Sequence, residues 1–305
     1  MKNVIRCLLL ALVSGLTFAC QNSKTSSQPA FLQARLIAIV VEDLGSSLDW
    51  YSQVLGGTLI KPIDSFPDYD LRMAFLQVGD FHLELIESGS AVPRSEILPS
   101  PEVSLGGWFK IGFLLPDIEA KYTQLQKIDS INFVTGIGEL PENELPIKWP
   151  RRFFLLQDPD GNYVQFFDGG AEENPSPWLF MNTVQDLSTA ISWYSTHLGF
   201  THHETVGELG NRRAIVERDN CVIELFEPAQ VLPIKEIASD QLILGFSKLA
   251  FGVNRFDTLL TQFRGGQVEI SHGPASSTFP WADQYVIVKD EEGTWVQLFE
   301  QRNTH

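Results

Sequence analysis

Two short apolar segments each carry a carboxylate at their centre. Residues 81–87 contain Glu84, and residues 221–227 contain Glu224. Side chains alternate between the two faces of a β-strand, so each glutamate shares a face with apolar neighbours. Burying an ionised carboxylate is costly unless a cation pairs with it or it coordinates a metal. The groups that face Glu84 and Glu224 therefore decide what chemistry this protein can do.

The two segments belong to an internal repeat. Three pairs of segments match in the same order in both halves of the 305 residues: 48–56 with 191–199, 81–87 with 221–227, and 158–167 with 290–299. Self-similarity of this kind identifies a repeated structural unit. The chain is also long enough for two domains. We therefore predict two homologous halves that join near the prolines of residues 175–177.

Each half again reads as two units. Residues 36–41 are rich in β-branched side chains and predict a strand, and apolar residues recur at helical spacing over 44–55. Asp43 or Ser46 can cap this helix, and Gly56 can end it. Further strands follow, and this order of strand, helix and strands occurs four times in the chain. The sequence thus predicts an α+β protein of four similar modules.

This architecture, with D-L followed by W-Y-x-x-x-L-G and later D-P-D-G-N-x-x-x-F, resembles the vicinal oxygen chelate superfamily of glyoxalases, bleomycin-resistance proteins and extradiol dioxygenases. The resemblance covers residues 33–301. It implies tandem glyoxalase-like domains, in which four βαβββ modules form two cup-shaped mixed sheets with helices outside and the ligand inside. We assign domain 1 to residues 33–170 and domain 2 to residues 171–305. Chain adjacency suggests that module one pairs with module two, and a more distant partner is the alternative.

Metal-dependent members of this superfamily take their ligands, usually His and Glu, from the first and last strands of each module. The corresponding positions here read Leu, Glu, Lys, Gln in both halves: Leu36, Glu84, Lys110 and Gln165, then Leu179, Glu224, Lys248 and Gln297. A protonated lysine has no electron pair to offer a metal, and one carboxylate with one amide does not make a zinc or iron site. We therefore expect no cofactor. A divalent metal held weakly by His82 and Glu84 is the alternative.

The lysines instead bring a positive charge to each cup. We expect Lys110 to lie opposite Glu84, and Lys248 opposite Glu224. Each pair is either a salt bridge that only fixes neighbouring strands or a pair that orients a polar ligand. A third reading is a lysine of lowered pKa that acts as a base or as a Schiff-base amine.

Other side chains are weaker candidates for ligand binding. Tyr163 and Trp295 share the cup-facing parity of Gln165 and Gln297 and can form apolar walls. Arginine suits the recognition of carboxylates and phosphates. The candidate ligand-binding set is therefore Glu84, Lys110, Gln165, Glu224, Lys248, Gln297, His82, Tyr163, Trp295, Arg72 and Arg212. Residues 158–161 look like part of a calcium loop but lack its later ligands, so we predict a simple turn there.

Charge and the N-terminal segment limit the partners and the location. The formal net charge of −16 argues against nucleic acid, because such binding needs clustered Lys and Arg. Residues 1–19, with Lys2 and Arg6 before a short apolar run, predict a signal peptide. The residues before Cys20 resemble a bacterial lipoprotein signal, so we expect lipidation of Cys20 and a tether over residues 20–32. An exported envelope protein anchored to the membrane follows, and a soluble secreted or periplasmic protein is the alternative.

We predict that this tandem protein binds or sequesters a small molecule without the usual metal. The alternative is an enzyme, either a glyoxalase-type lyase or isomerase or a dioxygenase-type oxygenase. Such an enzyme would use a metal or an acid–base pair, with Lys110 or Lys248 as the base and Glu84 or Glu224 as its partner. A third hypothesis is an interaction module in which bulky side chains fill both cups. The sequence does not indicate an oligomeric state.

Overall fold

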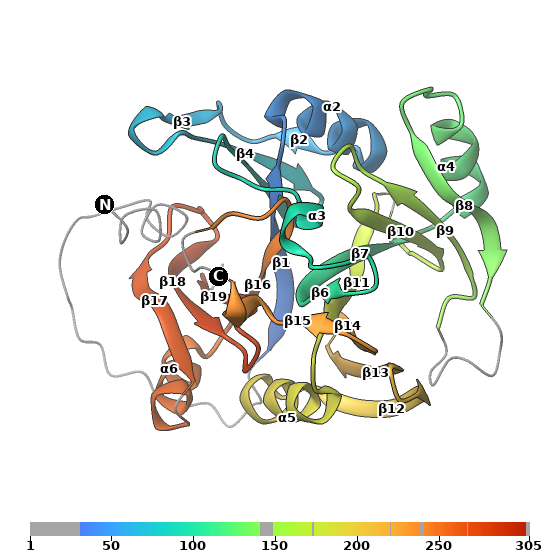
Figure 1. Cartoon of the computed structure of the whole chain (residues 1–305). Helices are drawn as coiled ribbons and strands as arrows, with labels where there is room; N and C mark the ends of the chain where they lie inside the picture. Colours follow the sequence, from blue (N-terminus) through green and yellow to red (C-terminus); the bar gives the residue numbers. More distant parts are fainter. Residues whose placement is uncertain are drawn as a thin grey trace.

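The computed structural model describes residues 31–140, 149–172, 174–219, 221–237, 241–266 and 268–302. The predicted signal peptide, Cys20 and nearly all of the tether lie outside these residues. The four predicted modules are present in chain order (Figure 1). Each consists of a strand, a helix and further strands, which confirms the α+β fold.

The modules of the first half are joined by a short connection. Module one contains β1 (Leu32–Val41), α2 (Leu44–Leu55), β2 (Thr58–Leu59), β3 (Asp64–Phe66), a 3-10 turn (Pro67–Tyr69), β4 (Leu71–Val78) and β5 (Phe81–Ser88). The connection contains α3 (Arg94–Ile97) and β6 (Ser104–Leu105). Module two contains β7 (Gly107–Leu115), α4 (Ile118–Leu125), β8 (Asn132–Glu139), β9 (Arg152–Gln157) and β10 (Tyr163–Asp168).

The second half repeats this plan. Module three contains β11 (Ser176–Thr183), α5 (Leu187–Leu198), β12 (Thr201–Glu208), β13 (Asn211–Arg218) and β14 (Cys221–Pro228). A connection with β15 (Val231–Leu232) and a 3-10 turn (Ile234–Glu236) follows. Module four contains β16 (Gly245–Val253), α6 (Phe256–Gly265), β17 (Glu269–Ser276), β18 (Ala282–Lys289) and β19 (Trp295–Gln301).

Two large sheets are each built from one module of each half. The β1 sheet has the order β17-β18-β19-β16-β1-β5-β4-β2, with β3 on β4, and so joins module four to module one. The β7 sheet has the order β12-β13-β14-β11-β7-β10-β9-β8 and joins module three to module two. Of the two pairings that the sequence left open, the structure has the more distant one. The first strand of module one, β1, pairs antiparallel with β16, and β7 pairs antiparallel with β11.

Helix α2 begins and ends where the sequence predicts, for local reasons. The Asp43 carboxylate accepts a hydrogen bond from the Ser46 amide at 2.6 Å and caps α2. Gly56 ends the helix with a φ of 73°, a left-handed conformation that favours glycine. Asp186 and Gly199 do the same for α5. The repeated D-L and L-G motifs are thus the two ends of equivalent helices.

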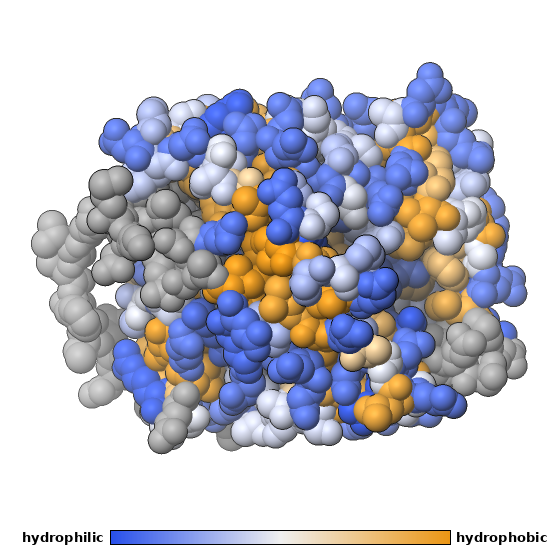
Figure 2. Space-filling model, in the orientation of Figure 1, coloured by the Kyte–Doolittle hydropathy of each residue, from blue (hydrophilic) through white to orange (hydrophobic). Residues whose placement is uncertain are grey.

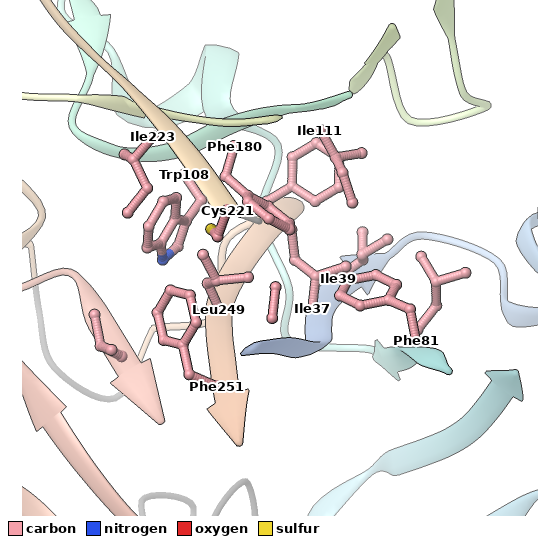
Figure 3. Close-up of a cluster of buried hydrophobic side chains, with 14 of the residues drawn as sticks. Ile37, Ile39, Phe81, Trp108, Ile111, Phe180, Cys221, Ile223, Leu249 and Phe251 are labelled. Atoms are coloured by element: carbon pink, nitrogen blue, oxygen red, sulfur yellow. The ribbon is translucent and has the colours of Figure 1, made fainter. Parts of the chain in front are cut away.

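The main hydrophobic core lies between the two sheets. Side chains from β1, β5, β7, β11, β14 and β16 point toward one another there (Figure 3). Phe81 of β5 contacts Phe180 of β11, with ring centroids 6.1 Å apart, so the two sheets share this core. Cys221 is buried in it, and burial raises the pKa of its thiol. The opposite face of each sheet is the one that the resemblance assigns to the ligand.

The Asp158 turn stabilises the fold across modules. The predicted turn is present: the Asp158 carboxylate accepts hydrogen bonds from the backbone amides of Asp160 and Asn162 at 3.0 and 2.7 Å. It also accepts one from the buried Tyr51 hydroxyl of α2 at 2.8 Å. The equivalent Asp290 accepts hydrogen bonds from the amides of Glu292 and Thr294. The repeated aspartate therefore serves the structure and does not form a calcium loop.

We expect the Tyr51→Phe variant to lower the free energy of unfolding by about 1–3 kcal/mol, because a buried carboxylate loses a hydrogen-bond donor. Urea denaturation measures this change. Tyr194→Phe in module three is the matched control. Its hydroxyl is 3.5 Å from the Asp290 carboxylate, against 2.8 Å for the Tyr51 hydroxyl and Asp158, so the hydrogen bond that it loses is weaker and its effect should be smaller. Equal losses in the two variants would contradict this account of the turn.

Candidate functional site

Each large sheet has two faces. One faces the shared core and the helices, and the other carries the lysine–glutamate pair of that sheet and is called its cup. In the β7 cup, Lys110 Nζ donates to Glu224 Oε2 at 3.1 Å. In the β1 cup, Lys248 Nζ lies 3.0 Å from Glu84 Oε2. The sequence predicted the lysine–glutamate pairs correctly in kind but wrongly in partner. Each lysine pairs with the glutamate of the other half.

Strand register explains the crossed pairs. Ala38 of β1 lies between Lys248 on one neighbouring strand and Glu84 on the other. Met181 of β11 lies in the same way between Lys110 and Glu224. Side chains at one register position point to the same face of a sheet, so lysine and glutamate meet across the middle strand. The module pairing described above thus decides which charges meet.

Both cups contain the same two polar atoms without partners. Gln165 Oε1 and Trp149 Nε1 in the β7 cup are buried and make no hydrogen bond within the described part of the chain. Gln297 Oε1 and Trp281 Nε1 are in the same state in the β1 cup. A buried polar atom without a partner costs about 1–3 kcal/mol. Each cup therefore contains one acceptor and one donor that an added molecule could satisfy.

The β1 cup is filled by aromatic side chains. Phe279 and Trp281 stack on each other with ring centroids 5.1 Å apart. Both contact Phe299 on the cup face of β19, at 5.6 and 4.9 Å. The Lys248 side chain is only 5% exposed. The lysine–glutamate pair of this cup is thus enclosed by packed rings, as the third hypothesis proposed for both cups.

The β7 cup is more accessible. The Lys110 side chain is 15% exposed, and Arg213, half exposed, lies 3.5 Å from the second oxygen of Glu224. Trp149 and Trp178 form an apolar wall, with ring centroids 5.2 Å apart. Two cations thus share one carboxylate in this cup.

Sequence reasoning did not select Arg213. The available signal was strand alternation, because Arg213 has the parity of Ile215, whose side chain packs in the β7 cup. Trp149 was not among the predicted site residues either, and its packing against the strand residue Phe167 places it in the same cup.

The other predicted residues divide between the cups and the outside. His82 lies in the β1 cup, where its ring stacks on Trp281 at 5.6 Å and Nδ1 is 3.3 Å from the Arg35 carbonyl. Burial lowers the pKa of His82. Tyr163 packs on Phe109 beside the β7 cup. Trp295 packs at the edge of the β1 cup.

Arg72 and Arg212 lie outside the cups, which corrects their place among the cup candidates. Arg72 points to the opposite face of β4 from the cup residue Met73, and Arg212 to the opposite face of β13 from the cup residue Ile215. Arg72 pairs with Glu87 at 2.9 Å, and Arg212 with Glu227 at 2.8 Å. These two glutamates accept hydrogen bonds from the first residues of α2 and α5. Both arginines therefore stabilise helix ends.

The neighbouring charges set the protonation state of Glu224 in the β7 cup. Burial raises the pKa of Glu224, but Lys110 and Arg213 outweigh this effect, and the pKa lies below its ordinary value of 4.5. Above that pH the ionised carboxylate stabilises the fold relative to the unfolded chain, and the contribution is lost as the pH falls through the folded-state pKa.

We therefore expect a Glu224→Gln variant to be less stable than the wild-type protein at neutral pH. The difference should shrink as the pH falls below 4.5. Urea denaturation of both proteins at several pH values measures it. A difference that is independent of pH would show that Glu224 is not held ionised by its neighbours.

At the positions that the resemblance gives to metal ligands, each cup holds a lysine–glutamate pair. In the β1 cup these positions are Leu36, Glu84, Lys248 and Gln297, and the Lys248 ammonium, 3.0 Å from Glu84 Oε2, has no electron pair to offer a cation. In the part of the chain that the structure describes, no three His, Cys, Asp or Glu side chains form a group that could hold a metal. Nor does any described helix have the length and apolar character needed to span a bilayer.

Comparisons with known proteins agree with this fold. Residues 34–166 and 180–298 match the Glyoxalase/Bleomycin resistance protein/Dioxygenase superfamily. Glyoxalase I from Zea mays has a similar structure, with a TM-score of 0.62 and 17% identity over 89% of this chain and 93% of that one. A putative dioxygenase from Bacillus subtilis subsp. subtilis str. 168 gives 0.59 and 13% over 88% and 85%. At such identities the likeness concerns the fold alone. No curated protein matches.

The sequence motifs, the two-sheet architecture and the matches over both halves agree. The chain belongs to the Glyoxalase/Bleomycin resistance protein/Dioxygenase superfamily.

Proposed function

We propose that the β7 cup binds a small molecule and that the protein acts as a binding protein. The observation that carries this proposal is the pair of buried polar atoms, Gln165 Oε1 and Trp149 Nε1, that find no partner among the described residues. A ligand that offers a donor to Gln165 and an acceptor to Trp149 removes the cost of both. The β1 cup, packed with rings around Lys248, serves stability in this proposal.

The charge and the walls of the β7 cup define the class of ligand. Lys110 and Arg213 share one carboxylate, so an added negative group is favoured near them. Trp149 and Trp178 offer apolar ring surfaces. We infer an aromatic or heterocyclic molecule that carries a carboxylate or carbonyl group and one hydrogen-bond donor. Retention of such a molecule needs no metal.

A matched pair of variants tests the site. Gln165→Leu removes the unpaired amide from the β7 cup, and Gln297→Leu makes the same change in the β1 cup. We would identify ligands by native mass spectrometry of the purified protein and by thermal shift with a panel of aromatic carboxylates. The expected result is at least a tenfold loss of affinity in Gln165→Leu and no change in Gln297→Leu. Equal effects, or no binding by the wild-type protein, would overturn the proposal.

We also propose that the protein is exported and anchored through a lipid on Cys20. Support comes from Lys2 and Arg6, the apolar run after them and the small residues before the cysteine. Metabolic labelling with palmitate in a bacterial host tests this. Label should appear in the wild-type protein and be absent from Cys20→Ala, which should leave the membrane fraction. Label in both proteins would contradict the assignment of Cys20.

A further inference from the structure

A separate pocket lies outside both lysine–glutamate pairs. Its volume is about 350 Å³, within the range of small-molecule sites. It is enclosed by the end of β1, the beginning of β19, the start of β7 and the connection around Ile234. Figure 2 shows apolar residues gathered at the centre of this face, over the region where β1, β16 and β6 lie in Figure 1.

The walls of this pocket are mostly apolar. They include Leu105, Trp108, Ile234, Leu242, Leu244 and Trp295. The Trp108 indole is not available to a ligand, because its Nε1 donates to the Trp295 carbonyl at 3.0 Å. An apolar body of a ligand would therefore be favoured by burial against these side chains.

Arg94 is a partly buried cation of the pocket wall that has no acidic partner among the described residues. Its Nε donates to the Leu244 carbonyl and its Nη2 to the Trp108 carbonyl, both at 3.1 Å. No carboxylate of the described residues lies within ion-pair distance of it. Burial lowers its pKa to about 10, and the charge of Asp158 only partly offsets this. A partly desolvated guanidinium fixed by two carbonyls is a prepared site for an anion.

The other charged groups of the wall have hydrogen-bond or ion-pair partners, or are exposed. Lys289 Nζ pairs with Glu269 Oε1 at 2.8 Å. The Asp290 carboxylate is bound by amides of its own turn. Lys235 is exposed, and its Nζ donates to the Glu291 backbone carbonyl at 2.9 Å. Among the described residues of this wall, Arg94 is the partly buried cation that has no carboxylate within ion-pair distance.

A second polar group supports the same reading. The Thr294 hydroxyl belongs to the pocket wall, is buried and has no hydrogen-bond partner among the described residues. A hydroxyl can donate to a carboxylate oxygen. The pocket thus combines apolar walls, a cation without an anion and a free hydroxyl.

We propose that this pocket binds an apolar monocarboxylate, with the carboxylate at Arg94 and the apolar body against Leu242, Leu244 and Trp295. The site is independent of the β7 cup, because none of the cup residues Lys110, Gln165 or Glu224 lines it. Bound carboxylate neutralises Arg94, and the chain rather than a metal supplies every contact.

Isothermal titration calorimetry with octanoate tests the proposal, and 1-octanol and acetate are the comparison probes. Octanoate should bind one per chain. Octanol, which lacks the charge, and acetate, which lacks the apolar body, should each bind at least tenfold more weakly. Arg94→Gln should weaken octanoate binding at least tenfold, and the matched control Arg213→Gln, in the β7 cup, should leave it unchanged.

A second variant keeps the test decisive if Arg94→Gln does not fold. Ile234→Trp fills the pocket without touching either hydrogen bond of Arg94, so it should abolish octanoate binding. Binding that survives Ile234→Trp would overturn the proposal, as would equal affinities for octanoate and octanol or no octanoate binding at all. Gln165→Leu should leave octanoate binding intact, which separates this site from the β7 cup.

Discussion

A Lys248→Met variant should lose about 3–5 kcal/mol of unfolding free energy, because it leaves the buried Glu84 carboxylate without a cation. Lys248 Nζ lies 3.0 Å from Glu84 Oε2, and both side chains are almost completely enclosed. An unpaired charge in such surroundings cannot be rehydrated without opening the packed rings of the β1 cup. Urea denaturation followed by circular dichroism measures the loss.

Two control variants separate this cause from a general loss of packing. The double variant Glu84→Leu/Lys248→Met removes both charges and should recover most of the stability, since apolar side chains often replace a buried ion pair at little cost. Lys110→Met in the β7 cup should cost less, because Arg213 still lies 3.5 Å from Glu224. A double variant that is as unstable as Lys248→Met would show that the charge is not responsible.

Residues 33–170, produced without the second half, should not form a stable monomer. In the whole protein β1 pairs with β16, and β7 pairs with β11, so both first strands lose a neighbour. The apolar faces that meet between the sheets also lose half of their partners. Unpaired strand edges favour association. We expect the fragment to aggregate or self-associate, as measured by size-exclusion chromatography with light scattering.

Co-expression with residues 171–305 provides the control for that experiment. The two halves together should form a soluble one-to-one complex with the unfolding behaviour of the whole chain, because each supplies the missing strands of the other. A monomeric 33–170 fragment that unfolds cooperatively would contradict this prediction. It would mean that each half is a separate domain, as chain order alone suggests.

The modules and their faces could be predicted because they depend on local patterns. The spacing of apolar residues and the repeated Asp43 and Gly56 motifs give strand, helix and cap without reference to distant parts of the chain. The alternation of side chains along a strand likewise places Glu84 and Gln165 on the cup faces. It would also have excluded Arg72, whose neighbours Met73 and Phe75 fill the cup while Arg72 itself faces the helices.

Module pairing could not be predicted in this way. A period of two residues tells which face a side chain takes but not which strand lies beside it. Lys110 was therefore matched with Glu84, its neighbour in the chain, although register places it beside Glu224. The pocket around Arg94 was missed for a related reason, because its wall is assembled from short segments of modules one, two and four and of both connections, none of which has a distinctive pattern.

The crossed module pairing also fixes the order in which the chain can complete its sheets. Phe180 pairs with Ile111, a short distance along the chain, whereas Leu36 pairs with Ala250. Contacts of small sequence separation form sooner, because less loop entropy is lost. During synthesis the β7 sheet can therefore close while module four is still being made. Strand β1, by contrast, has one edge open until β16 has been synthesised, so completion of the β1 sheet is the late and aggregation-exposed step of folding.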